Sequence, residues 1–311
     1  MPLTNLVIMK STKRIICILG PTAIGKTALS IDIAKRLNTE IISCDSRQFY
    51  KELLIGAAPP SQKELAQVKH HNIHNLSVTN NYNAGTFELD AIEKIEQLHK
   101  KKDNIIVVGG SGLYINAICK GFDKMPEISS NIREKINNQF SLKGMSWLQD
   151  EVKQIDPIFF ESCDTQNHQR LLRALEIYKA TGNTISSFRS EKNKVRPFEI
   201  IKIGLTMNRK LLYERIDARV DKMIEKGLIE EVKSLLPFQH KNALQTVGYK
   251  EIFSFYNNEC TLDQAVENIK KNTRRFAKRQ ITWFKKDKEI KWFETYQINK
   301  INKFISVISK L

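Results

Sequence analysis

The segment GPTAIGKT, Gly20–Thr27, has the residues best suited to chemistry. It matches the spacing G-x-x-x-x-G-K-[ST], and it lies between an apolar, strand-like run and a helix-like pattern, the context that this motif requires. Backbone amides and the positive end of the helix would face an anion, Lys26 would add a mobile charge, and Thr27 could hold Mg²⁺ beside phosphate oxygens. The sequence therefore predicts a phosphate site, without naming the molecule that carries the phosphates, at Gly20, Pro21, Thr22, Ala23, Ile24, Gly25, Lys26 and Thr27.

Two more loops follow apolar runs and are expected at the same sheet edge. In SCDSRQFY, the carboxylate of Asp45 is compatible with a metal ligand, a general base or an N-cap. VVGGSGLY, Val107–Tyr114, is a glycine-rich turn, which by itself indicates only tight backbone geometry. The third strand does not end in the aspartate that usually serves nucleotide hydrolysis, and this weakens an ATPase interpretation.

The chain is strongly basic, with 50 Lys and Arg against 34 Asp and Glu. This balance favours a polyanionic partner, although solubility or the lysine bias of an AT-rich genome could also produce it. The segment 268–288 has nine Lys or Arg and a single Asp, interleaved with aromatic residues. On a helix, five of its cations gather broadly on one side and suit a phosphate backbone, whereas the alternative is a solvated helix face. They are Lys271, Arg274, Arg275, Lys278 and Arg279.

Two other groups of polar residues are less specific. A helix beginning after Asn208 and ending at Gly227 would carry a basic stripe of Arg215, Arg219, Lys222 and Lys226. Gln169, Arg170 and Arg173, near the start of a helix that ends at Gly182, could contact bases or phosphates; equally, Arg173 could pair with Glu176 at i,i+3. His70, His71 and His74 have no Cys or acidic partner at ligand spacing, so a turn or substrate-facing role is favoured over zinc.

The pattern of elements predicts an α/β fold. Runs at Ile15–Leu19, Glu40–Cys44, Asn104–Val108 and Phe198–Met207 indicate buried parallel strands, and helical periodicity fills the intervals between the first three. We expect a P-loop NTPase-like sheet core made of 1–122 and 196–311, with a mostly helical insertion at 123–195 and basic C-terminal helices, one of them from Leu262 to Phe284. Five scattered cysteines, no signal-peptide pattern and no membrane-length apolar run favour a cytoplasmic protein with reduced thiols.

Several segments together resemble the tRNA dimethylallyltransferases, also called isopentenyl-tRNA transferases, and they occur in family order over nearly the whole chain. They are GPTAIGKTALSIDIAKRL, IISCDSRQFYKELLIGAAPPS, VKHHNIH, IVVGGSGLYINAICKGF, QRLLRALEIYKATG, LYERIDARVDKMIEKGLIEEV, ALQTVGYKEI and NTRRFAKRQITWF. The zinc-finger extension of eukaryotic members is not among them, which points to the bacterial type.

The resemblance implies transfer of a dimethylallyl group from dimethylallyl diphosphate, with Mg²⁺, to N6 of adenosine 37 in the anticodon stem-loop of tRNA. The phosphate loop would hold the diphosphate, Asp45 would draw off the proton, and Arg215 would lie near the diphosphate or the substrate channel. By analogy, the tRNA contacts are Asp45, Ser46, Arg47, Gln48, Ser111, Arg133, Gln169, Arg170, Leu171, Leu172 and Arg173, to which the basic helix adds its cations. This sequence departs from the family pattern at two places. Ser111 stands where many members have threonine, and Asn167–His168 stands in a segment that is often acidic.

Two other functions remain open at this stage. A small-molecule P-loop kinase or other NTPase would consume ATP and ignore RNA. A non-catalytic RNA-binding protein would use the loop as a nucleotide-dependent switch. The resemblance favours a monomeric enzyme acting on tRNA, and it does not indicate which tRNAs are preferred or in what order the substrates bind.

Overall fold

The computed structural model describes residues 13–190 and 193–309, so the N-terminal segment assessed above for a signal peptide lies outside the described residues. The chain divides into two compact units. One contains the chain up to Lys120 and from Arg196 onward, and the other is Gly121–Val195, against the insertion limits of 123 and 195 expected from the sequence. We describe the two units separately.

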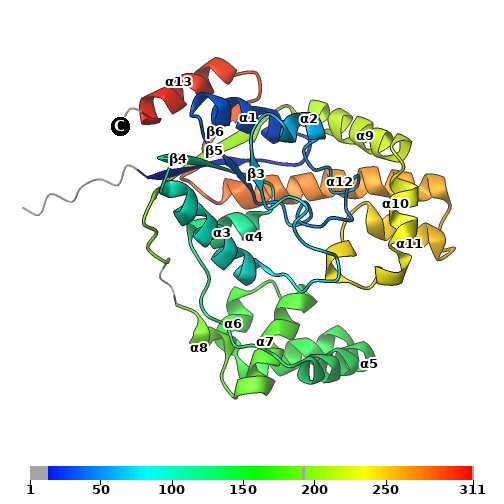
Figure 1. Cartoon of the computed structure of the whole chain (residues 1–311). Helices are drawn as coiled ribbons and strands as arrows, with labels where there is room; N and C mark the ends of the chain where they lie inside the picture. The colour runs from blue at the N-terminus through cyan, green and yellow to red at the C-terminus, as the bar shows by residue number, and fades with distance from the viewer. Residues whose placement is uncertain (1–12, 191–192, 310–311) are drawn as a thin grey trace, which may run out of the picture. The chain divides into compact units, whose positions relative to one another are not determined.

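A six-stranded parallel sheet forms the centre of the first unit (Figure 1). Its order is β3-β2-β4-β1-β5-β6, so the strand that leads into the phosphate loop lies in the interior of the sheet. The four predicted strands are confirmed, whereas the two at the sheet edges, His70–His71 and Lys291–Glu294, were missed because neither is a continuous apolar run. The strands are β1 Arg14–Leu19, β2 Ile41–Ser43, β3 His70–His71, β4 Asn104–Gly109, β5 Glu199–Thr206 and β6 Lys291–Glu294.

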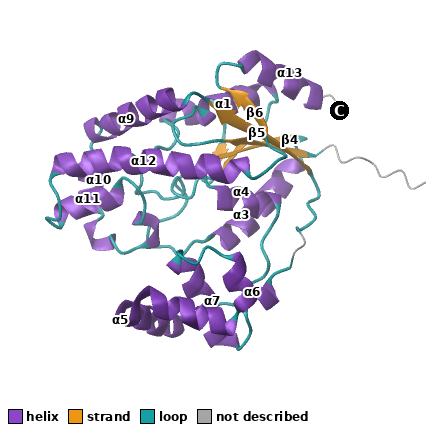
Figure 2. Ribbon diagram, turned by 180° about the vertical axis from the view of Figure 1, so that it is seen from behind, coloured by secondary structure: helices purple, strands orange, loops and turns teal. Residues whose placement is uncertain are grey.

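Helices cover both faces of the sheet, as Figures 1 and 2 show from opposite sides. Helices α1 (Lys26–Arg36) and α13 (Ile298–Ser309) lie on one face, and α3 (Ala84–His99) and α4 (Gly112–Cys119) on the other. Ile16 and Ile18 of β1 pack in the cluster that contains α1 and α13 residues. The intervening residues of β1 are equally buried, which explains why a continuous apolar run predicts this strand.

The remaining helices of this unit include the basic segments. The expected helix caps are confirmed: α9 (Arg209–Glu225) begins after Asn208, whose side chain accepts the N–H of Lys210, and left-handed Gly227 follows it. Helix α12 (Leu262–Lys285) packs on α9 and on α11 (Tyr249–Tyr256). The other helices are α2 Gln62–Leu65, α10 Leu228–Ser234, and the 3₁₀ turns η1 Leu236–Phe238 and η2 Asn242–Leu244.

The second unit is helical and has an apolar core of its own. Its helices are α5 Ser130–Ile155, α6 Pro157–Ser162, α7 His168–Thr181 and α8 Ile185–Phe188. Gly144, at φ 76°, interrupts α5, and the helices agree with the mostly helical insertion expected from the sequence. Buried Asp156 caps α6 through Phe159 N–H and also accepts the backbone N–H and hydroxyl of Ser186. The unit therefore has polar as well as apolar links between its helices.

Candidate active site

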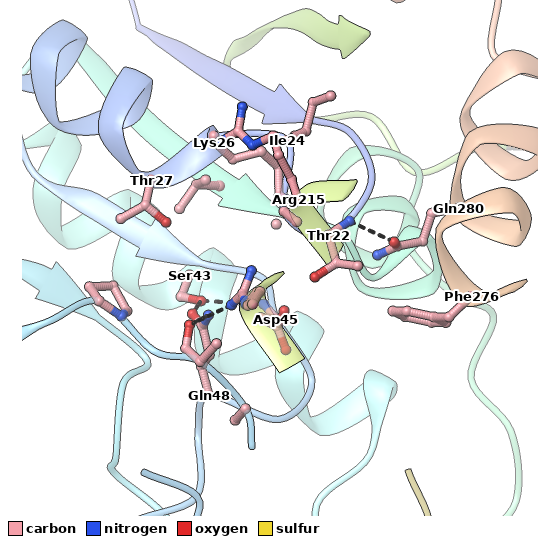
Figure 3. Close-up of a pocket in the computed structure, with 18 of the residues that line it drawn as sticks. Thr22, Ile24, Lys26, Thr27, Ser43, Asp45, Gln48, Arg215, Phe276 and Gln280 are labelled. Carbon is pink, nitrogen blue, oxygen red and sulfur yellow. Dashed lines mark hydrogen bonds between the residues drawn. The ribbon is translucent and has the colours of Figure 1, made fainter. Parts of the chain in front are cut away.

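A pocket of about 460 Å³ opens at the carboxyl ends of the strands in the first unit (Figure 3). Open parallel sheets place their ligand sites at this edge, because the loops that follow the strands converge there. The pocket brings together six residues of the phosphate loop, Asp45 and Gln48 from the loop after β2, Arg215 from α9, and Phe276 and Gln280 from α12. Parts of the chain separated by up to about 250 residues thus form one site.

The phosphate loop has the curled backbone of an anion cradle. Gly20, Ala23 and Gly25 have φ of 146°, 62° and 104°, and a Cβ on Gly20 would meet the carbonyl oxygen of Leu205 at 3.0 Å. This alternation of left-handed residues turns successive N–H groups towards a common point at the start of α1. The loop thus has the geometry that the G-x-x-x-x-G-K-T motif predicts.

Lys26 is held by the loop itself. Its Nζ donates to the carbonyl oxygens of Gly20 and Pro21, at 3.0 and 2.8 Å, while its aliphatic stem is partly buried. Burial lowers the pKa of Lys26 to about 8, with Asp45 opposing the shift and Arg219 adding to it. Gly20 and Pro21 therefore act through their carbonyl groups, and the other six loop residues line the pocket.

Asp45 lies across the pocket from Lys26 and Thr27 (Figure 3). Its Oδ1 accepts the N–H of Arg47 at 3.0 Å, in a local turn and not at the start of a helix. Ser43 supports this turn, since its Oγ accepts the N–H of Asp45 at 3.3 Å and donates to Oε1 of Gln48 at 3.0 Å. Of the three roles that the sequence left open for Asp45, the helix cap is thus the one that the structure does not support.

The neighbours of Asp45 form the rim. Ser46 donates its N–H to Oγ of Ser111, the residue before α4, at 3.2 Å. Arg47 donates from Nη1 to the carbonyl oxygen of Asn242 at 3.1 Å. Gln48 lines the pocket. The structure therefore brings the predicted residues 45–48 and Ser111 together beside the phosphate loop.

Helix α9 supplies a cationic wall. Arg215, Arg219 and Lys222 line the pocket, and Nη2 of Arg219 donates to the carbonyl oxygen of Ala58 at 3.4 Å. Burial lowers the pKa of Arg219, although Asp45 partly offsets this effect. Only Arg215 was predicted as a site residue, but the stripe at spacings of three and four already contained Arg219 and Lys222.

The loop 54–60 forms another wall and was missed from the sequence. Ala57, Ala58 and Pro60 line the pocket. The carboxylate of Glu231 on α10 accepts the backbone N–H groups of residues 54–56 at 2.7–3.0 Å, and the hydroxyl of Tyr249 at 2.7 Å. A carboxylate that satisfies three consecutive amides fixes the path of this loop.

Helix α12 presents its basic residues unevenly. Arg274 pairs with Asp217 at 2.5 Å, so this predicted RNA contact joins two helices, whereas Arg275, Lys278 and Arg279 are exposed, as is Lys271. Phe276 is 37% exposed and lies at the pocket, with the guanidinium of Arg279 5.8 Å from its ring centroid. The exposed cations and Phe276 thus form a surface next to the pocket.

The histidines after β2 include one that faces the pocket. His70 lines it, and within the described residues its Nε2 is buried with no hydrogen-bond partner; burial also lowers the pKa of His70. His71 Nε2 lies 2.7 Å from a carboxylate oxygen of Glu40. His70 thus lines the pocket and His71 pairs with a neighbouring carboxylate, while a substrate-facing role for His70 stays a prediction.

The predicted contacts in the insertion belong to the second unit. Gln169 and Arg170 are exposed at the start of α7, whereas Arg173 and Arg133 both pair with Glu176, at 3.5 and 3.4 Å. The i,i+3 pair that the sequence left open is therefore formed. Leu171 is fully buried in the core of this unit and Leu172 packs against it. The expectation that the Leu171 side chain contacts tRNA is wrong, because the amphipathic helix needs it for its own core.

Thr27 is the residue that the sequence predicts to hold a magnesium ion. It follows Lys26 in the first turn of α1 and lines the same pocket as Asp45. Mg²⁺ binds oxygen donors and keeps several water and phosphate ligands, so one hydroxyl beside a diphosphate fits it without a cluster of carboxylates.

Across residues 13–190 and 193–309, no helix is both long and apolar enough to span a membrane.

Comparisons with known proteins agree with this geometry. The family model described as IPP transferase matches residues 48–287. A protein of Christiangramia forsetii named tRNA dimethylallyltransferase is 50% identical over 96% of this chain and 98% of its own length. Another protein of that name, from Flavobacterium johnsoniae, is 48% identical over 91% of this chain and 93% of its own length.

Solved structures show the same relationship. The tRNA isopentenylpyrophosphate transferase of Bacillus halodurans superposes with a TM-score of 0.71 at 34% identity, covering 96% of this chain and 97% of that one. The structure of a eukaryotic dimethylallyltransferase acting on tRNA superposes with a TM-score of 0.75 at 26% identity, covering 91% of this chain and 74% of that one. The family model covers most of the chain, and relatives of that family are about half identical to it over nearly their whole length. The chain therefore belongs to the IPP transferase family.

Proposed function

We propose that the protein transfers a dimethylallyl group from dimethylallyl diphosphate to N6 of adenosine 37 in tRNA and releases pyrophosphate. The observation that carries this proposal is the pocket itself, in which a diphosphate cradle and the Asp45 carboxylate face each other. The relatives named as tRNA dimethylallyltransferases support the tRNA substrate. A tRNA substrate supports a cytoplasmic location, and we propose that the enzyme acts there as a monomer.

In the reaction, the bond between C1 of the dimethylallyl group and the diphosphate oxygen breaks as the bond from N6 to C1 forms. The loop amides and Lys26 stabilise the negative charge on the departing pyrophosphate, and Arg215 and Arg219 of α9 add positive charge to the same pocket. Mg²⁺ held by Thr27 would supply further positive charge at the phosphate oxygens.

Asp45 is placed to accept a proton. The adenine amino group is a weak nucleophile that is not deprotonated in advance near neutral pH, so its proton must leave as the new bond forms. The carboxylate of Asp45 has one oxygen engaged with Arg47 N–H, and the carboxylate as a whole lies in the pocket. It takes the N6 proton, and pyrophosphate carries away the electrons of the broken C–O bond.

The adenine must leave the base stack to reach this pocket, at a cost of a few kcal/mol that protein–RNA contacts offset. Residues Ser46, Arg47, Gln48 and Ser111 form the rim where those contacts would begin. Arg275, Lys278 and Arg279 offer exposed cations to the backbone of the anticodon stem-loop. In the insertion, we assign the remaining tRNA contacts to Arg133, Gln169, Arg170, Leu172 and Arg173.

The test is incubation of the purified protein with labelled dimethylallyl diphosphate, Mg²⁺ and tRNA lacking modification at position 37, without ATP. Label should enter the tRNA, and mass spectrometry of nucleosides should place it on N6 of adenosine 37. A tRNA in which guanosine replaces adenosine 37 is the matched control. Absence of transfer to competent tRNA would contradict the proposal, and ATP consumption without RNA would favour the kinase alternative.

A further inference from the structure

The glycine-rich turn after β4 is shaped by the helix that packs against it. A Cβ on Gly110 would lie 2.3 Å from Nε2 of Gln280, and one on Gly112 would lie 2.2 Å from the ring of Trp283. Both distances are too short for a real side chain, although neither glycine has a positive φ. The GGSG sequence therefore makes room for α12, so that this helix approaches the sheet edge next to the phosphate loop.

Gln280 uses that room to connect three parts of the chain. Its Oε1 accepts the backbone N–H of Thr22 at 2.9 Å, and its Nε2 donates to the carbonyl oxygen of Gly110 at 2.9 Å. The residue is only 7% exposed. Figure 3 shows the amide directed at the loop from the α12 side. Because one end of the amide accepts and the other donates, the two partners fix both its position and its orientation.

The phosphate loop is thereby held from two sides. Lys26 donates to the carbonyl oxygens of Gly20 and Pro21, and Gln280 binds the next N–H along the chain, that of Thr22. The loop also contains Ala23 with φ 62°, a conformation that an alanine rarely adopts unaided. The hydrogen bond from Thr22 to Gln280 does not involve Lys26, so it can hold the start of the loop while the Lys26 ammonium contacts a diphosphate.

We propose that Gln280 is a positioning residue, which holds the phosphate loop in its diphosphate-binding shape by joining Thr22 to the turn at Gly110. This inference rests on the proposed function, because it assumes that the loop binds a diphosphate. It also gives the segment RQITW, Arg279–Trp283, two tasks on one helix. Gln280 faces the loop, while Arg279, one residue before it, is exposed and belongs to the surface proposed to bind RNA.

The experiment titrates inorganic pyrophosphate with Mg²⁺ into the full chain by calorimetry. Gln280→Met keeps the length of the side chain and removes both hydrogen bonds, and Gly110→Ala displaces the Gln280 amide without altering it. We expect each variant to bind pyrophosphate about tenfold more weakly. Asn268→Met, at an exposed position of α12, makes the same exchange away from the loop and should bind as the unaltered chain does.

Steady-state transfer supplies a second measure. The KM for dimethylallyl diphosphate should rise about tenfold in both variants, while the KM for tRNA stays unchanged, a split that general loss of structure would not produce. Pyrophosphate affinity within twofold of the unaltered chain in either folded variant would overturn the proposal. If the unaltered chain itself binds no pyrophosphate, that result contradicts the proposed function and not the role of Gln280 alone.

A measurement on the unaltered chain needs no folded variant. By NMR, the amide hydrogen of Thr22 should exchange slowly before any pyrophosphate is added, because Gln280 already accepts it. Exchange as fast as that of exposed loop amides would also overturn the proposal.

Discussion

The charge of Lys26 should limit diphosphate binding above neutral pH. Burial lowers the pKa of this side chain to about 8, so about nine-tenths of it is protonated at pH 7 and about one-tenth at pH 9. A hydrogen bond from a charged donor contributes about 1.5–3 kcal/mol, or roughly 10- to 100-fold in affinity. Weighting the two forms by their populations, we expect pyrophosphate affinity to fall roughly five- to tenfold between pH 7 and pH 9.

The assay is calorimetric titration of pyrophosphate with Mg²⁺ at several pH values, on the unaltered chain and on Lys26→Arg. A guanidinium stays charged throughout this range, so the variant binds with its own affinity but without the alkaline decline due to Lys26. Any decline that remains in Lys26→Arg measures ionisation of the ligand and of other groups. The difference between the two profiles should have its midpoint near pH 8.

Folding stability should change in the opposite direction. Because the pKa of Lys26 is lower in the folded protein than its usual 10.5, the unfolded chain binds the proton more tightly. The contribution of this group to the free energy of unfolding therefore rises as pH increases from about 8 to 10.5, while pyrophosphate affinity falls. Two results would refute the assignment to Lys26. One is that pyrophosphate affinity changes with pH in the same way in the unaltered chain and in Lys26→Arg, and the other is that the affinity of the unaltered chain does not fall between pH 7 and pH 9.

Three more outcomes are expected. Asp45→Asn should lower single-turnover transfer by about 10²- to 10⁴-fold with tRNA affinity nearly unchanged in filter binding, and an unaltered rate would reduce Asp45 to a turn residue. Replacing Arg275, Lys278 and Arg279 by Gln should weaken tRNA binding and reduce the slope of log affinity against log salt by about three, whereas an equal slope would mean that this surface faces away from the RNA. Glu231→Gln should lower the free energy of unfolding by about 1–3 kcal/mol in thermal melts, because it weakens acceptors for three loop amides; no measurable change would contradict that role.

The centre of the fold could be predicted because local sequence patterns determine it. The four predicted strands are largely apolar and buried, with Lys202 of β5 as a charged exception, and the phosphate loop has a motif that is recognisable from its own residues. The edge strands β3 and β6 have the sequences HH and KWFE, which contain no continuous apolar run of strand length. Their existence depends on neighbours that are distant in the sequence.

The same distinction applies to the site. Lys26, Thr27 and Asp45 line the pocket, and their positions could be predicted because the first two belong to the phosphate-loop motif and Asp45 closely follows β2. Gln280 and Glu231 were missed, since both act on backbone groups about 170 to 260 residues away, and nothing in their local sequence indicates those partners. For Arg274 and Leu171 the helix and its polarity were predicted correctly, but tertiary partners decide which side chains remain available.

The position of β1 has a consequence for synthesis of the chain. One edge of β1 pairs with β4, which ends at Gly109, and the other with β5, which begins only at Glu199. At about 5–20 residues per second, the 89 residues from 110 to 198 take a ribosome roughly 4–18 seconds. During that interval the nascent chain has an unpaired edge in what will be the interior of its sheet, which is a template for pairing with other chains. The interval coincides with emergence of the helical insertion, so a chaperone that shields extended chain would be needed most while those helices are being made.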